Sequence, residues 1–434
     1  MDVLPGMGIF LVLIMMFLGM GVWVFAGLFM VAIGAMVLVT DMPMTQIGTI
    51  LRTVTWRSAS AWELSAIPLF IWMGEIIFRT DISDRLFRGL SPMVQWLPGR
   101  LLHTNVLGCT LFAAISGSTS ATTATVGRIT TGALAERQYD NSLAVGSLAG
   151  AGSLGLLIPP SIVMIIYGVL AEVSIAKLFI AGILPGLMIA FLYSLYIMIR
   201  CAADPSLAPK TEGRVGWGDV LQGLSDLTPI FVLIGLVLGS IYSGIATPSE
   251  AAAVGVAATI LLVAAMGKLR LQVLIDAGFS AVSTSAMVCT ILVAAAVLST
   301  AIGYAHIPQE LVKLIESLQL SPYVLLLMLA VFYLVLGCFL DGISIIVMTL
   351  PITLPLIVQA GFNPVWYGVF LVLMCELATM TPPVGFNLFI LQSLTGQPIS
   401  RVARAAFPFF LLMVLAVVLI SAFPQIVLFM TAFV

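Results

Sequence analysis

The chain has 434 residues, of which 61% are hydrophobic and only 8% are charged, and its mean hydropathy is +1.19. A soluble domain carries about 25% charged residues, so a chain of this length with so few charges cannot cover itself with a water-compatible surface. We therefore expect a membrane protein that is solvated by the lipid bilayer. The net charge of −2, without a basic patch or an arginine-rich tail, argues against nucleic acid as a partner.

Uninterrupted apolar runs predict most of the membrane spans, because a helix that crosses the hydrocarbon core needs about 20 apolar residues. The expected spans are Phe10 to Gly19 (extended at both ends), Val22 to Val39, Ala61 to Phe78, Leu178 to Ile199, Leu227 to Tyr242, Ala251 to Met266, Ser280 to Ile302, Val365 to Leu377 with its extension, and Ala405 to Phe423. The pattern predicts an all-α polytopic protein with roughly ten or more crossings.

Two apolar regions are long enough to span but are interrupted halfway. Leu101 to Leu134 contains the hydroxyl-rich stretch ISGSTSATTATVG (115–127), and Tyr323 to Val358 contains FLDGIS (339–344). Irregular backbone at membrane depth is tolerated only where it is buried in protein or lines a cavity. Each region is therefore predicted to be a re-entrant helical hairpin that returns to the side from which it enters.

Proline pairs interrupt two further apolar segments, GLLIPP (155–160) and ATMTPPVGFN (378–387). Proline has no backbone N–H and frees a carbonyl one turn earlier in the chain. We expect two broken helices here, with a simple proline kink as the alternative reading of the first.

Two segments have an amphipathic pattern, Asp81 to Pro98 and Ile307 to Leu320. Such helices lie in the plane of the membrane interface. Each precedes a predicted hairpin, so both are expected to be arms that brace a hairpin against a scaffold.

The lysines and arginines predict the orientation, because cytoplasmic loops carry an excess of positive charge. With the N-terminus outside, only Arg52, Arg57, Lys177 and Lys313 of the 17 basic residues fall on the outer side. The first hairpin then opens from the cytoplasm and the second from the opposite face.

An internal repeat is expected from matches at nearly one sequence offset. Gly21-Val22 corresponds to Gly244-Ile245, Ile82 and Leu86 to Ile307 and Leu311, Gly117 and Thr119 to Gly342 and Ser344, and Pro159-Pro160 to Pro382-Pro383. An inverted repeat is typical of secondary transporters, in which substrate and coupling ions bind near the midplane where discontinuous helices meet.

The first hairpin tip has the composition of an uncharged cation site. Ser116, Ser118 and Thr119 supply hydroxyl oxygens around Gly117, while the hydroxyls that follow on the return limb are assigned to helix packing. Acids inside a membrane are functional hypotheses by default. Asp341, at the second tip, is the candidate for charge balance, and Glu75 and Glu376 are equally compatible with structural roles.

Taken together, SGSTSATTATVG, GSLGLLIPPSI, ATPSEAAAVGV, LDGIS and TPPVGFNLF resemble the large membrane subunit (the M or DctM-like subunit) of tripartite ATP-independent periplasmic (TRAP) transporters, over essentially the whole chain. The resemblance implies the ion-transporter-superfamily fold, an elevator mechanism, coupling to two or more Na⁺ ions, a separate small four-helix membrane subunit and a periplasmic substrate-binding protein. It also implies a location in the bacterial inner membrane.

The resemblance further implies where the ions bind. One sodium site falls on Ser116, Thr119, Gly155, Ile158 and Pro160, and a second on Gly342, Thr379, Thr381 and Pro383. Ser118, Ser344 and Asn387 are the candidates for substrate contact.

The expected organisation is a scaffold with an arm in 1–98, half of a transport domain with the first hairpin in 99–200, and a cytoplasmic connecting loop in 201–220. The second scaffold unit and arm occupy 221–320, and the second hairpin and the C-terminal helix occupy 321–434.

The expected function is sodium-coupled uptake of an organic acid, such as a C4-dicarboxylate or sialic acid, and not an enzymatic reaction. A stand-alone sodium-coupled anion carrier of the same superfamily is the main alternative. A passive channel fits opposed hairpins less well. A serine hydrolase built on Ser118 and His103 would lack a third orienting group.

Overall fold

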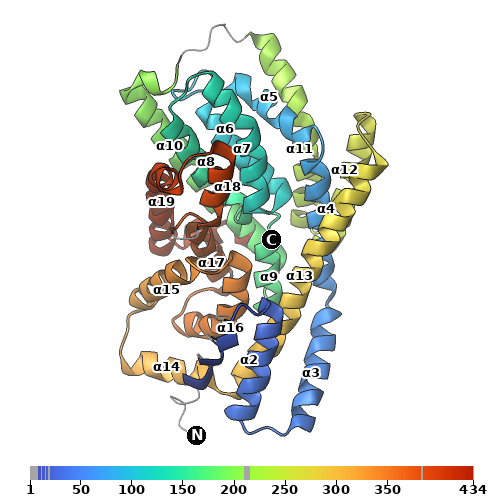
Figure 1. The fold of residues 1–434 in the computed structure, drawn as a ribbon, viewed down its shortest axis with the longest axis vertical. Helices are drawn as coiled ribbons and strands as arrows, with labels where there is room; N and C mark the ends of the chain where they lie inside the picture. The colour runs from blue at the N-terminus through green and yellow to red at the C-terminus, as the bar shows by residue number, and fades with distance from the viewer. Residues whose placement is uncertain are drawn as a thin grey trace.

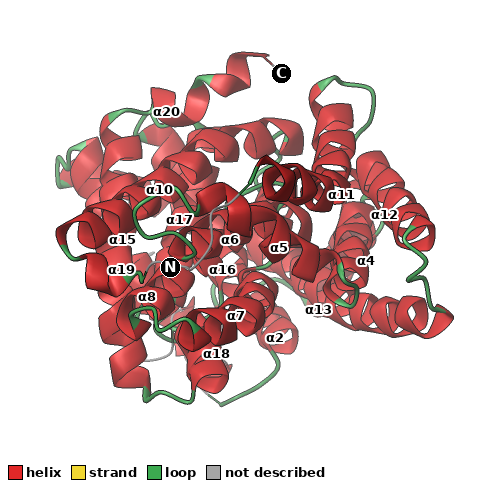
Figure 2. Cartoon of the chain, turned by 90° about the horizontal axis from the view of Figure 1, so that it is seen from above, coloured by secondary structure: helices red, strands yellow, loops and turns green. Residues whose placement is uncertain are grey.

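The computed structural model describes residues 8–433 except 11, 15, 18–19, 210–215 and 383–384. All regular elements in this part of the chain are helices (Figures 1 and 2), as the apolar composition predicts. Pro383, one of the predicted sodium ligands, lies outside the described residues.

The N-terminal unit holds the first arm and a helix that the sequence analysis did not predict. Its elements are α2 (Val24–Leu38), α3 (Met44–Ala59), η1 (Trp62–Ser65), α4 (Ala66–Phe78) and α5 (Ile82–Val94). Helix α3 escaped prediction because it is polar and exposed, with Ile47 as its buried residue. The segment predicted as the first arm forms helix α5, whose buried side chains include Ile82, Leu86 and Leu90, and its role as an arm stays a prediction.

The first hairpin and the first broken helix follow, as predicted. The elements are α6 (Leu102–Ser116), α7 (Thr119–Glu136), α8 (Asn141–Gly152), η2 (Ser153–Leu156), α9 (Ile162–Leu170) and α10 (Ile175–Ala203). The break between α8 and α9 contains both prolines, and it separates two helices by residues 153–161 rather than kinking one continuous helix.

The second half begins with the scaffold helices and the second arm. These are η3 (Pro205–Leu207), α11 (Trp217–Tyr242), α12 (Pro248–Ala265), α13 (Leu271–Tyr304) and α14 (Ile307–Ser317). The predicted connecting loop 201–220 is therefore too long at both ends, because α10 continues through Ala203 and α11 already begins at Trp217.

The second hairpin and the second broken helix complete the chain. They are α15 (Pro322–Gly337), α16 (Gly342–Gln359), α17 (Pro364–Thr379) and α18 (Phe386–Thr395), followed by α19 (Ile399–Ala422), α20 (Gln425–Leu428) and η4 (Met430–Phe433).

Fewer helices span the full membrane thickness than the apolar runs suggested. Among the described residues, six helices are long and apolar enough to cross a membrane, or seven if α3 and the bent segment Trp62–Phe78 form one span. The shorter apolar helices include α6, α15, α17 and α18, which are limbs of hairpins or halves of broken helices. The difference arises because glycines and prolines divide apolar runs into half-length pieces.

The order of element types is the same in both halves of the chain, with an arm, a hairpin and a broken helix in succession. Figure 1 shows arm α5 and hairpin α6–α7 toward one end of the molecule, and arm α14 and hairpin α15–α16 toward the other. The matched glycines Gly21 and Gly244 share a left-handed conformation, with φ of 72° and 71°. These features agree with an inverted repeat, which stays a prediction.

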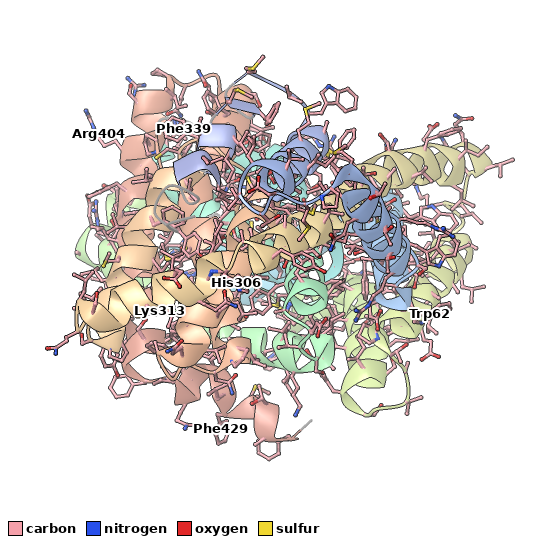
Figure 3. All side chains as sticks on the ribbon, turned by 90° about the horizontal axis from the view of Figure 1, so that it is seen from below. Trp62, His306, Lys313, Phe339, Arg404 and Phe429 are labelled. Atoms are coloured by element: carbon pink, nitrogen blue, oxygen red, sulfur yellow. The ribbon has the colours of Figure 1, made fainter. Side chains whose placement is uncertain are left out.

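Two groups of helices pack mainly among themselves. Helices α2, α3, α4, α12 and α13 lie together, and α11 packs on α5; the hairpins, broken helices and α19 form the other group. Trp62 and Arg404 mark opposite edges of the molecule (Figure 3).

Lys268 donates to Asp81 at 2.9 Å and lowers the pKa of that carboxyl, so this ion pair between the start of α5 and the loop after α12 stays charged at neutral pH.

Candidate functional site

The tip of the first hairpin is a tight turn held by its own hydroxyls. Gly117 adopts φ of 57°, a left-handed conformation that suits glycine. The Ser118 hydroxyl caps α7 by accepting from Ala121 N at 3.4 Å. The hydroxyls of Ser116 and Thr122 lie 2.9 Å apart. The Ser116 and Thr119 side chains at this turn are buried, and Ser118 is partly buried.

The first hairpin tip packs directly on the first broken helix. A Cβ atom added at Gly155 would lie 2.5 Å from the backbone N and Cα of Thr119, and one added at Gly117 would lie 2.7 Å from the Pro160 carbonyl oxygen. Four of the residues predicted for the first sodium site, Ser116, Thr119, Gly155 and Pro160, thus belong to two segments in backbone contact. Ile158, the fifth, lies in the same break and is buried.

The second hairpin tip is organised by Asp341. Its carboxylate caps α16 by accepting from the backbone N–H groups of Ile343, at 3.1 Å, and of Ser344, at 3.3 Å. The Ser344 hydroxyl donates to the other carboxylate oxygen. Asp341 is exposed, so its charge is not enclosed within the protein. The carboxylate therefore has a structural role at the tip beside the predicted role in charge balance.

Asp341→Asn separates these two roles, since asparagine caps a helix about as well as aspartate. We expect Asp341→Asn to unfold near the wild-type temperature, and Asp341→Ala to lose about 1 kcal/mol with the cap. If the charge assists cation binding, Asp341→Asn raises the sodium concentration needed for half-maximal uptake. Thermal unfolding and a sodium titration of uptake measure the two effects, and an unchanged titration would leave Asp341 only as a cap.

The second hairpin packs on the second broken helix in the corresponding way. A Cβ atom at Gly337 would meet the Cβ of Ala378 and lie 3.0 Å from its Cα. The Cys338 thiol donates to the Pro382 carbonyl at 3.4 Å. The Thr379 and Thr381 hydroxyls donate to the carbonyls of Glu376 and Leu377, at 2.8 and 2.7 Å, which leaves their oxygen lone pairs free to bind a cation.

The two hairpin–helix units adjoin each other at their centres. A Cβ atom at Gly342, the first residue of α16, would lie 3.2 Å from Cβ of Cys375 and 3.5 Å from the Leu156 side chain. The second hairpin thus touches both broken helices. The two predicted sodium sites are therefore neighbours in one connected region.

Glu376 connects the two units, a contact that the sequence analysis left open. This side chain of α17 is fully buried. Its carboxylate accepts from Leu156 N at 2.6 Å and from the Thr119 hydroxyl at 3.2 and 3.1 Å. Its partners lie 220 and 257 residues away in the sequence, so the only local signal was an acid just before the proline break in an apolar run.

Asn387, predicted as a substrate contact, lies against α8. It is 1% exposed and its amide donates to the Ala149 carbonyl at 3.0 Å. A Cβ atom at Gly152 would meet the Thr123 hydroxyl and lie 3.3 Å from the Asn387 amide nitrogen. In this conformation Asn387 ties α18 to α8, and its role as a substrate contact stays a prediction, as do those of Ser118 and Ser344.

The donors gathered at the site are mostly uncharged oxygens. Hydroxyls and main-chain carbonyls come from the tips and the breaks, and the described residues contain no cluster of three or more His, Cys, Asp or Glu side chains that could hold a metal ion. Carbonyls of unwound backbone and half-helix ends are the groups that coordinate Na⁺ in transporters built from broken helices. The donor set therefore suits a monovalent cation rather than a transition metal.

A cavity of about 830 Å³ with a mixed polar and apolar lining lies beside the first broken helix, between the scaffold and the turn from α9 to α10. Thr53, Ser174, Thr247 and Thr300 are among the residues that line it. Arg57 of α3 and Glu172 of the turn approach to 4.0 Å across this cavity, with both side chains largely exposed. The cavity thus lies where α3, the start of α12 and α13 face the turn from α9 to α10.

An all-helical membrane protein in which two hairpin tips, two broken helices and uncharged oxygen donors meet has the architecture of a secondary membrane transporter. Comparison with known proteins identifies the family. Residues 9–426 match the family described as "Tripartite ATP-independent periplasmic transporter, DctM component", and the chain belongs to this family.

Curated relatives agree with this assignment. The chain is 32% identical over 378 residues to the C4-dicarboxylate TRAP transporter large permease protein DctM of Pseudomonas aeruginosa, covering 86% of each chain. It is 32% identical over 371 residues to the ectoine/5-hydroxyectoine TRAP transporter large permease protein UehC of Ruegeria pomeroyi, covering 85% of this chain and 86% of the relative. It is 29% identical over 368 residues to the sialic acid TRAP transporter large permease protein SiaM of Vibrio cholerae, covering 84% and 85%. These relatives are transporter permeases rather than enzymes.

A solved structure shares the fold. The YdaH transporter of Alcanivorax borkumensis superposes with a TM-score of 0.59 over 90% of this chain and 91% of that chain, at 15% sequence identity. The likeness supports the architecture described above.

Proposed function

We propose that this large permease subunit carries out sodium-coupled secondary active uptake of an organic acid across the bacterial inner membrane. A periplasmic binding protein delivers the acid, and a small four-helix membrane subunit completes the transporter. The observation that carries the proposal is the convergence of both hairpin tips and both helix breaks on one oxygen-rich region, in a chain of the DctM family.

The substrate class is proposed from the relatives, whose names specify C4-dicarboxylate and sialic acid. Ser118 and Ser344 lie at the two tips and carry hydroxyls suited to hydrogen-bond a carboxylate.

An elevator movement is supported by the way the helices group. The hairpins and broken helices pack tightly on each other, so they are suited to move as one body that carries the site. Arms α5 and α14 flank that body from opposite ends (Figure 1) and can follow its movement relative to the scaffold helices.

Sodium supplies the driving force in this proposal. Each Na⁺ that enters contributes about 2.3 kcal/mol per 100 mV of membrane potential, and about 1.4 kcal/mol for each tenfold concentration gradient. Two ions therefore offset the charge of a dicarboxylate while their gradients still favour uptake.

Uptake into proteoliposomes tests the proposal. The purified subunit, with its small membrane partner, is supplied with labelled organic acids, and the binding protein and an inward Na⁺ gradient are each included or omitted. We expect uptake only when both are present. Uptake with Na⁺ but without a binding protein would contradict the tripartite mechanism and indicate a stand-alone carrier.

Removing one predicted ligand from each sodium site should weaken sodium dependence. We expect Ser116→Ala and Thr381→Ala each to raise the sodium concentration for half-maximal uptake by about tenfold, the effect of losing roughly 1.4 kcal/mol of binding. Thr131→Ala is the matched control for Thr381→Ala, because Thr131 makes the same type of bond, to Gly127 O at 2.6 Å, away from both breaks. Equal sodium titrations for Thr381→Ala and Thr131→Ala would remove Thr381 from the site.

A further inference from the structure

A fully buried carboxylate sits where three parts of the site meet. Glu376 lies on α17, and its two partners are the Thr119 hydroxyl at the first hairpin tip and the Leu156 N–H in the first helix break. An N–H group can only donate, so the contact at 2.6 Å requires Glu376 to present an acceptor oxygen. The single Thr119 hydroxyl lies 3.2 and 3.1 Å from the two oxygens of this carboxyl group, so both oxygens are in contact with a neighbouring donor.

These two donors do not neutralise the charge of the carboxylate. The ion pairs found among the described residues involve other acids, namely Asp81, Asp226, Glu75, Glu172 and Glu310. A charge buried in an apolar interior is strongly unfavourable unless it is paired. Glu75, by comparison, lies in the scaffold helix α4 and pairs with Arg79 at 3.2 Å.

The Glu376 carboxyl group has no counterpart at the matching position in the first half of the chain. At the offset that aligns Pro159-Pro160 with Pro382-Pro383, Glu376 corresponds to Ser153, whose hydroxyl donates to the Gly150 carbonyl at 2.7 Å. The negative charge is therefore present once. Its hydrogen bonds run to the first hairpin and the first break, although Glu376 belongs to the second half.

We propose that Glu376 supplies the fixed negative charge of the first sodium site, and that Na⁺ bound between the first hairpin tip and the first break is its counter-ion. The ion would lie within reach of the oxygens of Ser116, Thr119 and the break, with the carboxylate directly behind Thr119. This inference rests on the proposed sodium coupling and extends it, because it assigns the charge partner of one ion.

The pairing has a consequence for the movement of the hairpins and broken helices, which are together called the transport body. Glu376, Thr119 and Leu156 all belong to that body, so the charge travels with the site. Without Na⁺ an unpaired carboxylate would cross the apolar interior, which is unfavourable. Sodium binding would then be needed before the loaded body can move.

Sodium-dependent thermal unfolding tests the pairing without relying on transport. The purified protein with its small membrane subunit is heated in NaCl or in choline chloride at equal ionic strength, and the midpoint is followed as Na⁺ is varied. Glu376→Gln retains an acceptor oxygen for Leu156 N–H but removes the charge. Glu75→Gln is the control, a neutralised acid in a scaffold helix, and Glu376→Asp keeps the charge on a shorter side chain.

We expect the wild-type midpoint to rise with Na⁺, and Glu376→Gln to need at least about tenfold more Na⁺ for the same rise. Glu75→Gln should respond like the wild type, and Glu376→Asp should respond better than Glu376→Gln. Identical sodium responses of wild type and Glu376→Gln would overturn this inference and leave sodium coupling intact. No sodium response in the wild type would overturn both.

A measurement on the wild-type protein covers the case in which Glu376→Gln fails to fold. Infrared difference spectra with and without Na⁺, on protein labelled with ¹³C at glutamate carboxyls, report a change at a glutamate carboxylate. We expect a sodium-induced shift of a glutamate carboxylate band that persists in Glu75→Gln. A sodium response in unfolding without any such shift would contradict the pairing.

Discussion

Gly155→Ala is expected to abolish uptake, although it adds a single methyl group. The added Cβ would lie 2.5 Å from the backbone N and Cα of Thr119 and 2.6 Å from the carbonyl carbon of Ser118. Backbone atoms cannot move aside by changing a rotamer, so the hairpin tip must withdraw from the break. Overpacking of this kind costs about 1–3 kcal/mol, and withdrawal also separates the proposed ligands of the first sodium site.

The control for this variant is Gly132→Ala, the same chemical change in α7. No heavy atom outside its own helix lies within 4 Å of a Cβ built there, and alanine favours helix formation over glycine by about 1 kcal/mol. We expect it to transport like the wild type. Uptake in proteoliposomes and size-exclusion profiles measure activity and folding separately. Normal uptake by Gly155→Ala would show that the tip and the break need not be in contact.

The second large effect is expected at the other hairpin, where Gly337→Ala should also abolish uptake. Its Cβ would collide with the Cβ of Ala378, immediately before the second break. Alanine has no side-chain torsion that could relieve the contact, so α15 must shift away from α17. The second predicted sodium site, which includes Thr379, would then be distorted.

A compensating change tests whether this contact is the cause. Ala378→Gly removes the colliding atom, so Gly337→Ala combined with Ala378→Gly should recover much of the uptake lost in the single variant. The double-mutant comparison isolates the pair, since such cycles measure coupling between residues in contact. Loss of uptake that is unaffected by Ala378→Gly would assign the defect to something other than this contact.

Much of the architecture follows from interruptions in apolar runs, because such interruptions are local. Gly117 and the hydroxyls around it predicted the first hairpin, whose limbs end at Ser116 and begin again at Thr119. The proline pair at 159–160 predicted the first break. Backbone that lacks regular hydrogen bonds inside a membrane is tolerated only where it is buried in protein or lines a cavity. An interruption in an apolar run is therefore a strong indication of a hairpin or a broken helix.

Helix α3 and the number of full spans could not be predicted from the apolar runs and their interruptions. Helix α3 is too polar to stand out as a span, and it packs on α13 of the scaffold. Half-length helices such as α17 look like spans in an apolar run, because hydropathy does not report where a helix breaks.

The site itself could be predicted in its ligand types but not in its connections. Hydroxyls, glycines and prolines identified the tips and breaks. The hydrogen bonds from Thr119 and Leu156 to Glu376 join segments more than 200 residues apart. The hydrogen bond from Asn387 to Ala149 joins residues 238 positions apart. Such contacts depend on how the two halves of the chain pack, and that packing cannot be predicted from local patterns in a single sequence.

Simultaneous flux of ²²Na⁺ and a labelled organic acid into the same proteoliposomes tests the central claim most directly. With the binding protein and the small subunit present, we predict that about two or more Na⁺ ions enter with each acid molecule. Both fluxes should stop when the binding protein is omitted, and both should fall in Ser116→Ala and Thr381→Ala at limiting Na⁺. Acid uptake without accompanying ²²Na⁺ would contradict the assignment of the converging tips and breaks as a sodium-coupled site.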